Sequence, residues 1–334
     1  MTLYAKTGDM LVGRIHRAGT ACLLSIPTLS LTGCVPDQSA LHPASVEAQQ
    51  VATLFWVMAI AGGVIWAVVM ATAIYAVVGR WRPTSERFAD RFILWAGVVF
   101  PTIVLATLLT YGLGLLPSWT GTQPALRVTV EARQFWWRIT YERPDGTRVE
   151  TANELHLPLD QVTEFALISP DVIHSFWIPV LGGKLDAIPG RTNHLRLTPN
   201  TTGRFRGVCA EFCGLSHALM AFDVVVQTRG DFDDWLSRQA APARIPDAAP
   251  LRAAGCLACH SLRGVSDAGR IGPDLTHLAS RKTIAAGMLP NTPEALGTWL
   301  TDPEAVKPGA TMPGYAMLPA AELDRIITLL GELE

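Results

Sequence analysis

The sequence predicts a multi-domain membrane protein in which a transmembrane two-helix hairpin is followed by an all-β domain and then by an all-α domain. Three observations predict this order. Two apolar segments in the first third of the chain carry no charged residue, and each exceeds the roughly 20 residues that a membrane-spanning helix needs. After residue 125 apolar and polar side chains alternate, as they do in half-buried strands, and after residue 248 apolar side chains recur at helical spacing.

The composition supports this class. Of the 334 residues 17% are charged, which is below the roughly 25% of an ordinary soluble protein. The 27 Lys and Arg residues nearly balance the 29 Asp and Glu residues, so we expect no nucleic-acid partner. An even number of cysteines in an exported protein usually indicates disulfides; here the six are Cys22, Cys34, Cys209, Cys213, Cys256 and Cys259.

Residues 1–33 are predicted to be an export signal, because basic residues precede an apolar core at 21–31. The core ends in Leu-Thr-Gly-Cys at residues 31–34, which resembles a bacterial lipoprotein box, so cleavage would leave Cys34 as a lipidated first residue. The alternative is an uncleaved signal anchor. After cleavage, residues 34–50 are expected to be a periplasmic N-terminal segment.

The hairpin is predicted within residues 51–118, with helices at about 51–79 and 92–116. Neither helix is interrupted by a charge, which disfavours a buried helical pair in a soluble core. The connecting loop 80–91 contains four arginines, so the positive-inside rule places it in the cytoplasm. We therefore expect a multi-pass protein of the bacterial inner membrane, in contact with lipid, whose C-terminal domains lie on the periplasmic side.

The exported part is predicted to contain a β domain at 125–228, a linker at 229–247 and a helical domain at 248–334. Alternation is clearest in Leu126, Val128 and Val130, and it recurs at Leu195/Leu197 and at Phe222/Val224/Val226. Thr292 followed by Pro293 is typical of a helix start. The apolar residues Leu323, Ile326, Ile327 and Leu330 then have the spacing of an amphipathic helix.

A first group of possible metal ligands lies at the end of the β domain. Cys209, Cys213, His217 and Met220 lie within one twelve-residue stretch, and His174 lies between two predicted strands. Two thiolates, two imidazoles and a thioether favour copper over metals that prefer oxygen ligands. A zinc site and a Cys209–Cys213 disulfide are the alternatives, although zinc makes little use of methionine.

A second group lies in the helical domain. Cys256, Cys259 and His260 form C-x-x-C-H, the attachment signature of a c-type haem, in which both thiols bind the haem covalently and the histidine binds the iron. Half of a zinc site or a redox dithiol is the alternative. A sixth iron ligand is expected from a later methionine, and the candidates are Met288, Met312 and Met317.

The β domain and the hairpin together resemble subunit II of cytochrome c oxidase over roughly residues 40–228. The resemblance is carried by the strings at 171–176 (Asp-Val-Ile-His-Ser-Phe), 184–191 (Lys-Leu-Asp-Ala-Ile-Pro-Gly-Arg) and 209–220. It implies a cupredoxin-like barrel that holds a dinuclear copper centre, CuA. Cys209 and Cys213 would then bridge the two coppers and His174 and His217 would each cap one. The weak ligands would be Met220 and the backbone carbonyl of Glu211.

The resemblance has further implications. The Glu211 side chain is expected to contact a magnesium ion at the interface with the catalytic subunit. In the helical domain, the residues around Met312 (Thr-Met-Pro-Gly-Tyr at 311–315) resemble the methionine loop of class I cytochromes c, which favours Met312 as the sixth ligand. Asp171, beside the first copper motif, is either a supporting residue or part of a surface turn.

Three residues depart from the subunit II pattern. Val208 stands where the family usually has glutamine, and Phe92 stands where many relatives have a glutamate associated with proton entry. Phe135 replaces the tryptophan through which an external cytochrome c delivers electrons. The last departure favours another entry route, which the haem domain would supply.

The sequence therefore predicts the electron-entry subunit of a terminal cytochrome c oxidase with a fused class I cytochrome c domain. Electrons would pass from one covalently bound haem through CuA to catalytic subunit I, where oxygen is reduced to water with proton pumping. No catalytic residue is expected on this chain. Expected partners are subunits I and III and an upstream donor such as a soluble or membrane cytochrome c. The alternatives are the electron-entry subunit of a CuA-containing nitric oxide reductase and a copper-delivery or redox-sensing lipoprotein.

Overall fold

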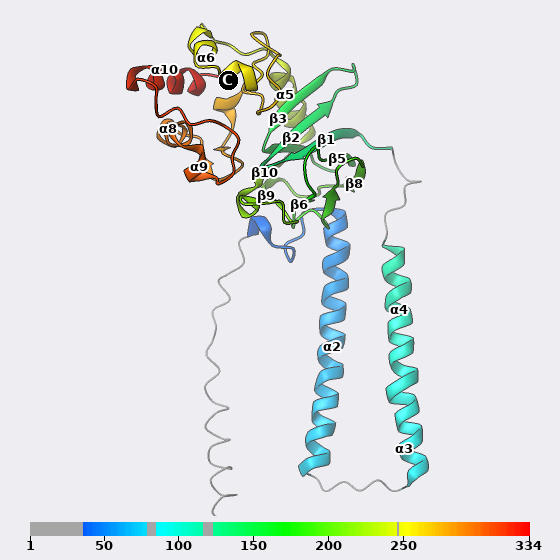
Figure 1. Ribbon diagram of the computed structural model, residues 1–334. Helices are drawn as coiled ribbons and strands as arrows, with labels where there is room; N and C mark the ends of the chain where they lie inside the picture. The colour runs from blue at the N-terminus through cyan, green and yellow to red at the C-terminus, as the bar shows by residue number, and fades with distance from the viewer. Residues whose placement is uncertain (1–35, 79–84, 116–122, 246) are drawn as a thin grey trace, which may run out of the picture. The chain divides into compact units, whose positions relative to one another are not determined.

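The computed structural model describes residues 36–78, 85–115, 123–245 and 247–334 (Figure 1). These ranges include nearly all of both predicted hairpin helices and of both exported domains. The export signal, the lipidation site at Cys34 and two of the four loop arginines lie outside the described residues.

Two long apolar helices follow the short 3-10 turn η1, Pro36–Gln38 (Figure 1). The first is α2, Val46–Val78. The second is continuous from Glu86 to Gly114 and consists of α3 (Glu86–Phe92), the π-helical stretch η2 (Ile93–Val99) and α4 (Phe100–Gly114). Both are long and apolar enough to cross a membrane, and their apolar side chains are exposed on the chain, as lipid-facing surfaces would be.

Both helices begin earlier than the sequence predicted, because polar residues cap them. The Ser45 hydroxyl accepts a hydrogen bond from the Ala48 N–H at 3.0 Å, and Ser85 caps the second helix through the Phe88 N–H. Half of the predicted loop 80–91 is therefore helix. Pro101 does not end the second helix, because the widened turn of η2 lies directly before it.

The β domain consists of two five-stranded sheets. The first has the order β3-β2-β1-β5-β8, with bounds Arg148–Ala152, Trp136–Glu142, Leu126–Arg133, Thr163–Ile168 and Asn193–Leu197. The second has the order β4-β10-β9-β6-β7, with bounds Glu154–Pro158, Ala221–Gln227, Gly203–Cys209, His174–Trp177 and Leu185–Ala187. One pair in each sheet is parallel, β1 with β5 and β4 with β10, and the other pairs are antiparallel.

The predicted alternation is confirmed in β1 and β10, whereas in β8 only Leu197 is buried and Leu195 is half-buried like its neighbour Arg196. Leu126, Val128 and Val130 of β1 are buried, and so are Phe222, Val224 and Val226 of β10. Because successive side chains of a strand point to opposite faces, the inner faces of the two sheets close on one apolar core. The fully buried Trp137 contacts Phe176 and Phe222 there, with ring centroids 5.7 and 5.3 Å away.

The segment expected to begin the linker forms a helix instead, α5 (Arg229–Ala240). Phe232, Trp235 and Leu236 have the spacing of one helical face, and all three are buried in the core of the β domain. Trp235 stacks on His156 with ring centroids 3.9 Å apart. The helix thus completes the β domain, and only residues 241–247 connect it to the next one.

The C-terminal domain is helical and has its own apolar core. Its elements are α6 (Ala249–Ala253), α7 (Cys256–Cys259), the 3-10 turn η4 (Leu278–Ser280), the two-residue strands β11 (Thr283–Ile284) and β12 (Leu289–Pro290), α8 (Pro293–Thr301), α9 (Pro303–Val306) and α10 (Ala320–Gly331). The predicted cap is confirmed, since Thr292 accepts a hydrogen bond from the Ala295 N–H. The predicted amphipathic helix is also confirmed, with Ile326 and Leu330 buried.

Hydrogen bonds join the two exported domains. The Ala221 N–H of β10 donates to the Ala286 carbonyl at 3.1 Å, and Arg206 donates to the Gly287 carbonyl at 3.1 Å. The Thr283 hydroxyl donates to the Asp223 carboxylate at 2.5 Å. Residues 283–287 of the helical domain thus lie against the β9–β10 hairpin.

We predict that Trp235→Ala lowers the free energy of unfolding of the β domain by about 3–5 kcal/mol, because it removes a buried aromatic side chain from the core. Chemical denaturation followed by tryptophan fluorescence measures this. Ser237→Ala, on the exposed face of the same helix, is the control and should change stability little. Equal stability of the two variants would contradict a core role for α5.

Candidate metal and haem centres

The possible copper ligands are gathered by one hairpin and one neighbouring strand. Cys209 ends β9, Met220 directly precedes β10, and Cys213 and His217 lie in the loop between them. The Cys209 N–H donates to the Met220 carbonyl at 3.0 Å, which closes the loop at its base. His174 begins β6, which pairs with β9, so its ring reaches the same end of the sheet.

The side chains converge closely. The two cysteine Sγ atoms are 3.8 Å apart. His174 Nδ1 lies 3.9 Å from Cys209 Sγ, and His217 Nδ1 lies 3.7 Å from Cys213 Sγ. Met220 Sδ lies 3.9 Å from Cys213 Sγ, and the Glu211 carbonyl oxygen lies 3.2 Å from Cys209 Sγ. The structure therefore brings together all six residues that the sequence singled out.

The environment of this cluster suits a soft metal. His174 is fully buried, Met220 is 1% exposed, and Cys209 and Cys213 are also buried. The hydrogen bond between the two thiols lowers the pKa of Cys209 and raises the pKa of Cys213. Cys209 therefore loses its proton first, and Cys213 retains the proton that it donates to the Cys209 thiolate. Buried thiolates with imidazole and thioether neighbours form the donor set that copper prefers.

Asp171 supports the cluster rather than forming only a surface turn. Its Oδ1 lies 2.8 Å from His174 Nε2, which leaves Nδ1 facing Cys209, and its Oδ2 accepts a hydrogen bond from the Gln134 N–H at 2.8 Å. Burial lowers the pKa of His174, but the hydrogen bonds to Cys209 and Asp171 raise it by more. A carboxylate in this position fixes the orientation of a ligating histidine.

The side chain of Glu211 and its backbone carbonyl point in different directions. The carboxylate is 45% exposed and lies 3.9 Å from the Lys184 ammonium group. The carbonyl faces the cysteines while the carboxylate lies at the surface.

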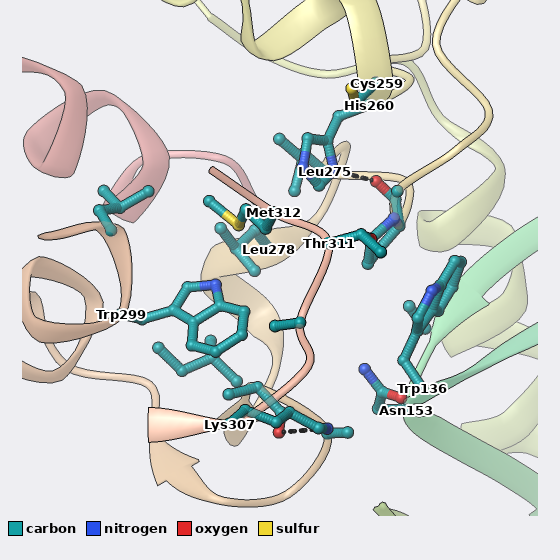
Figure 2. A pocket seen from close by; sticks show the side chains of 18 of the residues that line it. Trp136, Asn153, Cys259, His260, Leu275, Leu278, Trp299, Lys307, Thr311 and Met312 are labelled. Carbon is teal, nitrogen blue, oxygen red and sulfur yellow. Dashed lines mark hydrogen bonds between the residues drawn. The ribbon is translucent and has the colours of Figure 1, made fainter. Parts of the chain in front are cut away.

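The second centre is a cavity bordered by the haem attachment motif. Cys256, Cys259 and His260 line it together with Met312, and Figure 2 shows His260 and Met312 from separate segments pointing into the same space. The His260 Nδ1–H donates to the Pro273 carbonyl at 2.7 Å, which leaves Nε2 free to bind iron. Burial lowers the pKa of His260, which favours the neutral ring that an iron ligand must be.

The residues around His260 fit a ring held in one orientation. A Cβ on Gly272 would lie 2.5 Å from the His260 ring, so only glycine allows the imidazole this position. Of the three candidate methionines, Met312 alone is among the residues that line the cavity, and Met317 is 77% exposed. The donor set therefore fits a c-type haem with histidine and methionine ligands.

The β domain also contributes to this cavity, which the sequence did not predict. Phe135, Trp136 and Asn153 line it, and Figure 2 shows Trp136 and Asn153 on the side of the β strands. Trp137, the next residue, points into the β core, where its ring centroid lies 6.3 Å from that of His174. Because β2 alternates between faces, adjacent tryptophans border the two centres.

Comparisons with known proteins match both domains. A family model described as "Cytochrome C oxidase subunit II, periplasmic domain" matches residues 138–228, and a cytochrome c model matches residues 248–334. Cytochrome c oxidase subunit 2 of Alkalihalophilus pseudofirmus is 31% identical over 342 residues, which cover 93% of this chain and 96% of that one.

The chain belongs to the cytochrome c oxidase subunit II family. A second relative, cytochrome c oxidase subunit 2 of Bacillus sp. (strain PS3), is 35% identical over 62% of each chain. The crystal structure of the periplasmic domain of subunit II from Bradyrhizobium japonicum is 30% identical and covers 36% of this chain and 96% of that one, with a TM-score of 0.34. This subunit II is thus a membrane-anchored oxidoreductase subunit with a periplasmic copper-domain fold and a C-terminal cytochrome c domain.

We predict that Met312→Ala abolishes the low-spin histidine–methionine spectrum of the haem in this subunit II, because no other described methionine lines the cavity. Optical spectroscopy near the methionine–iron charge-transfer band measures this. Met317→Ala, at an exposed position, should keep the band. A Met312→Ala protein with an unchanged spectrum would refute the ligand assignment.

We also predict that copper protects Cys209 and Cys213 from a thiol reagent. In the metal-free protein both thiols should be labelled, and after copper loading the labelling of both should fall at least tenfold, as read by mass spectrometry of the peptide that contains them. Cys213→Ser should leave Cys209 reactive in the presence of copper, because it removes one of the two thiolates. Equal labelling of the two thiols with and without copper would contradict the assignment of Cys209 and Cys213 as copper ligands.

Proposed function

We propose that this subunit II is the electron-entry subunit of a haem-copper terminal oxidase and that both of its centres serve one-electron transfer. Electrons would enter at the haem held by Cys256, Cys259, His260 and Met312 and continue to a dinuclear CuA centre held by the cluster around Cys209 and Cys213. The destination would be catalytic subunit I, where oxygen is reduced to water with proton pumping. When bound, the haem iron and the copper pair would each accept and release a single electron.

The observation that carries this proposal is the convergence of two thiols, two imidazoles, a thioether and a backbone carbonyl where the β9–β10 hairpin loop meets the start of β6. The two thiols lie 3.8 Å apart, and each has an imidazole nitrogen within 4 Å. A rigid cluster favours fast electron transfer, because its ligands move little when the charge changes. The layer formed by Trp137, Phe176 and Phe222 packs behind His174 and limits such movement.

The chain's own residues set up the chemistry of both sites. Asp171 orients His174, the Pro273 carbonyl orients His260, and the aromatic core keeps bulk water away from the cysteine cluster. Neither centre needs a general acid, a general base or a nucleophile from this chain. Proton and oxygen chemistry belong to the partner subunit in this proposal.

Several finer points are part of the same proposal. The two apolar helices would form a multi-pass hairpin in the bacterial inner membrane, with Arg87 and Arg91 near the cytoplasmic side. The exposed Glu211 carboxylate would contact magnesium at the interface with subunit I. Subunit III and an upstream cytochrome c would complete the assembly.

Metal and optical analysis of the purified chain tests the proposal. We expect two coppers with a mixed-valence electron paramagnetic resonance signal and one covalently bound haem on this chain. Cys209→Ser should lose both coppers and keep the haem, because it removes a shared ligand. Zinc in place of copper, or a Cys209–Cys213 disulfide in the native protein, would overturn the assignment of the cluster.

Co-purification then identifies the reaction. A partner with haem-copper optical bands that consumes oxygen supports the oxidase. Nitric oxide consumption without oxygen consumption would point instead to a nitric oxide reductase. A chain that purifies without any such partner and exchanges its copper rapidly would point to copper delivery.

A further inference from the structure

A buried lysine connects the two exported domains close to both centres. Lys307 is 3% exposed, and its Nζ donates hydrogen bonds to the Phe135 carbonyl at 2.5 Å and to the Ala285 carbonyl at 3.2 Å. Phe135 belongs to the β domain, whereas Ala285 belongs to the helical domain. Lys307 therefore bonds across the boundary between them, and Figure 2 shows it at the edge of the haem cavity.

The two residues after Lys307 also contact the β domain. The Ser216 hydroxyl donates to the Pro308 carbonyl at 2.6 Å. Gly309 has a φ of +81°, and a Cβ there would lie 3.1 Å from the Phe135 ring and 3.5 Å from Leu215. We call residues 307–309 with Phe135, Leu215 and Ser216 the interdomain junction.

The interdomain junction adjoins the copper ligand loop on the β side and the Met312 loop on the helical side. On the β side, Ser216 is buried and directly precedes His217, and Gln134, next to Phe135, donates from its side chain to the Cys213 carbonyl at 2.5 Å. On the helical side, only two residues separate Gly309 from Met312. The junction thus lies between the copper ligand loop and the methionine loop of the haem.

Burial of the Lys307 ammonium group is unfavourable by itself. Its two described hydrogen-bond partners are neutral carbonyls, and no ion pair involving Lys307 is found among the described residues. Burying a charge is costly unless hydrogen bonds compensate for the loss of water. Removing the Lys307 ammonium group would in turn leave the Phe135 and Ala285 carbonyls without this hydrogen-bond donor. The group therefore holds both carbonyls at a fixed separation, which ties the two domains in one arrangement.

We propose that Lys307 is a positioning residue that docks the methionine loop of the haem domain onto the copper ligand loop and so sets the rate of electron transfer within the chain. This rests on the proposed function. In the step concerned, one electron leaves the reduced haem iron and one arrives at the oxidised copper pair, and no bond or proton changes. The junction would take the place of the docking surface that a free cytochrome c needs.

Lys307→Met tests this, because it keeps most of the side-chain volume and removes the donor. Lys282→Met is the matched control: it removes the same charge from the same domain, but its side chain is exposed, and the contact of Lys282 with Glu154 runs through its backbone N–H. Both variants are made in the assembled, metal-loaded oxidase. The haem is reduced rapidly by a small photo-excited ruthenium complex, and the appearance of the electron at copper is followed optically.

We expect Lys307→Met to slow transfer from haem to copper at least tenfold. The rate at which the ruthenium complex reduces the haem, the histidine–methionine band and the mixed-valence copper signal should stay unchanged. Hydrogen exchange, measured by mass spectrometry, should rise in the peptides that contain residues 213–217 and 303–312. Lys282→Met should match the unmodified protein in every measurement.

The outcomes separate the alternatives. An unchanged transfer rate in Lys307→Met with both centres intact would overturn the positioning role while leaving the proposed function in place. Loss of the haem band or of the copper signal would also overturn it, since Lys307 would then support a centre rather than the junction. Ser216→Ala removes the second junction hydrogen bond from the β side; a similar slowing there supports the proposal, and wild-type transfer in both variants refutes it.

Discussion

The antiparallel pairing of β9 and β10 is the constraint on which both centres depend. It opposes Ala221 to Val208 and closes with the bond from the Cys209 N–H to the Met220 carbonyl, so a loop of ten residues must return on itself. That return brings two thiols, an imidazole and a thioether to one place. The same hairpin accepts the helical domain, because the Ala221 N–H, on the edge of the ligand loop, bonds to the Ala286 carbonyl.

The aromatic core makes this constraint stiff. Trp137, Phe176 and Phe222 are all fully buried and contact one another, and Trp137 also contacts the His174 ring. Close-packed interiors transmit small displacements instead of absorbing them. A substitution at Trp137, Phe176 or Phe222 would therefore displace the ligand side chains, even though none of these three residues is itself a ligand.

The ligands of the two centres could be predicted from the sequence more completely than the structure that surrounds them. The ligand types at 209–220 and at 256–260 lie close in sequence, so their spacing alone indicates the chemistry. Helix α5 was expected to be linker, because Phe232 and Trp235 lie among charged residues and their burial depends on a β surface formed far earlier in the chain. Lys307 has no local pattern at all. Its importance arises from Phe135, 172 residues away, and only the tertiary structure brings the two together.

The docking of α5 on the β domain also limits how far the haem domain could travel. With the helix held to Ala240, eight residues remain before α6, and an extended chain of that length spans roughly 28 Å at most. So short a tether keeps the local concentration of the carrier around its own copper site in the millimolar range or above. In a membrane crowded with oxidases, each complex would then be supplied by its own carrier, and the density of neighbouring complexes would have no influence on this transfer.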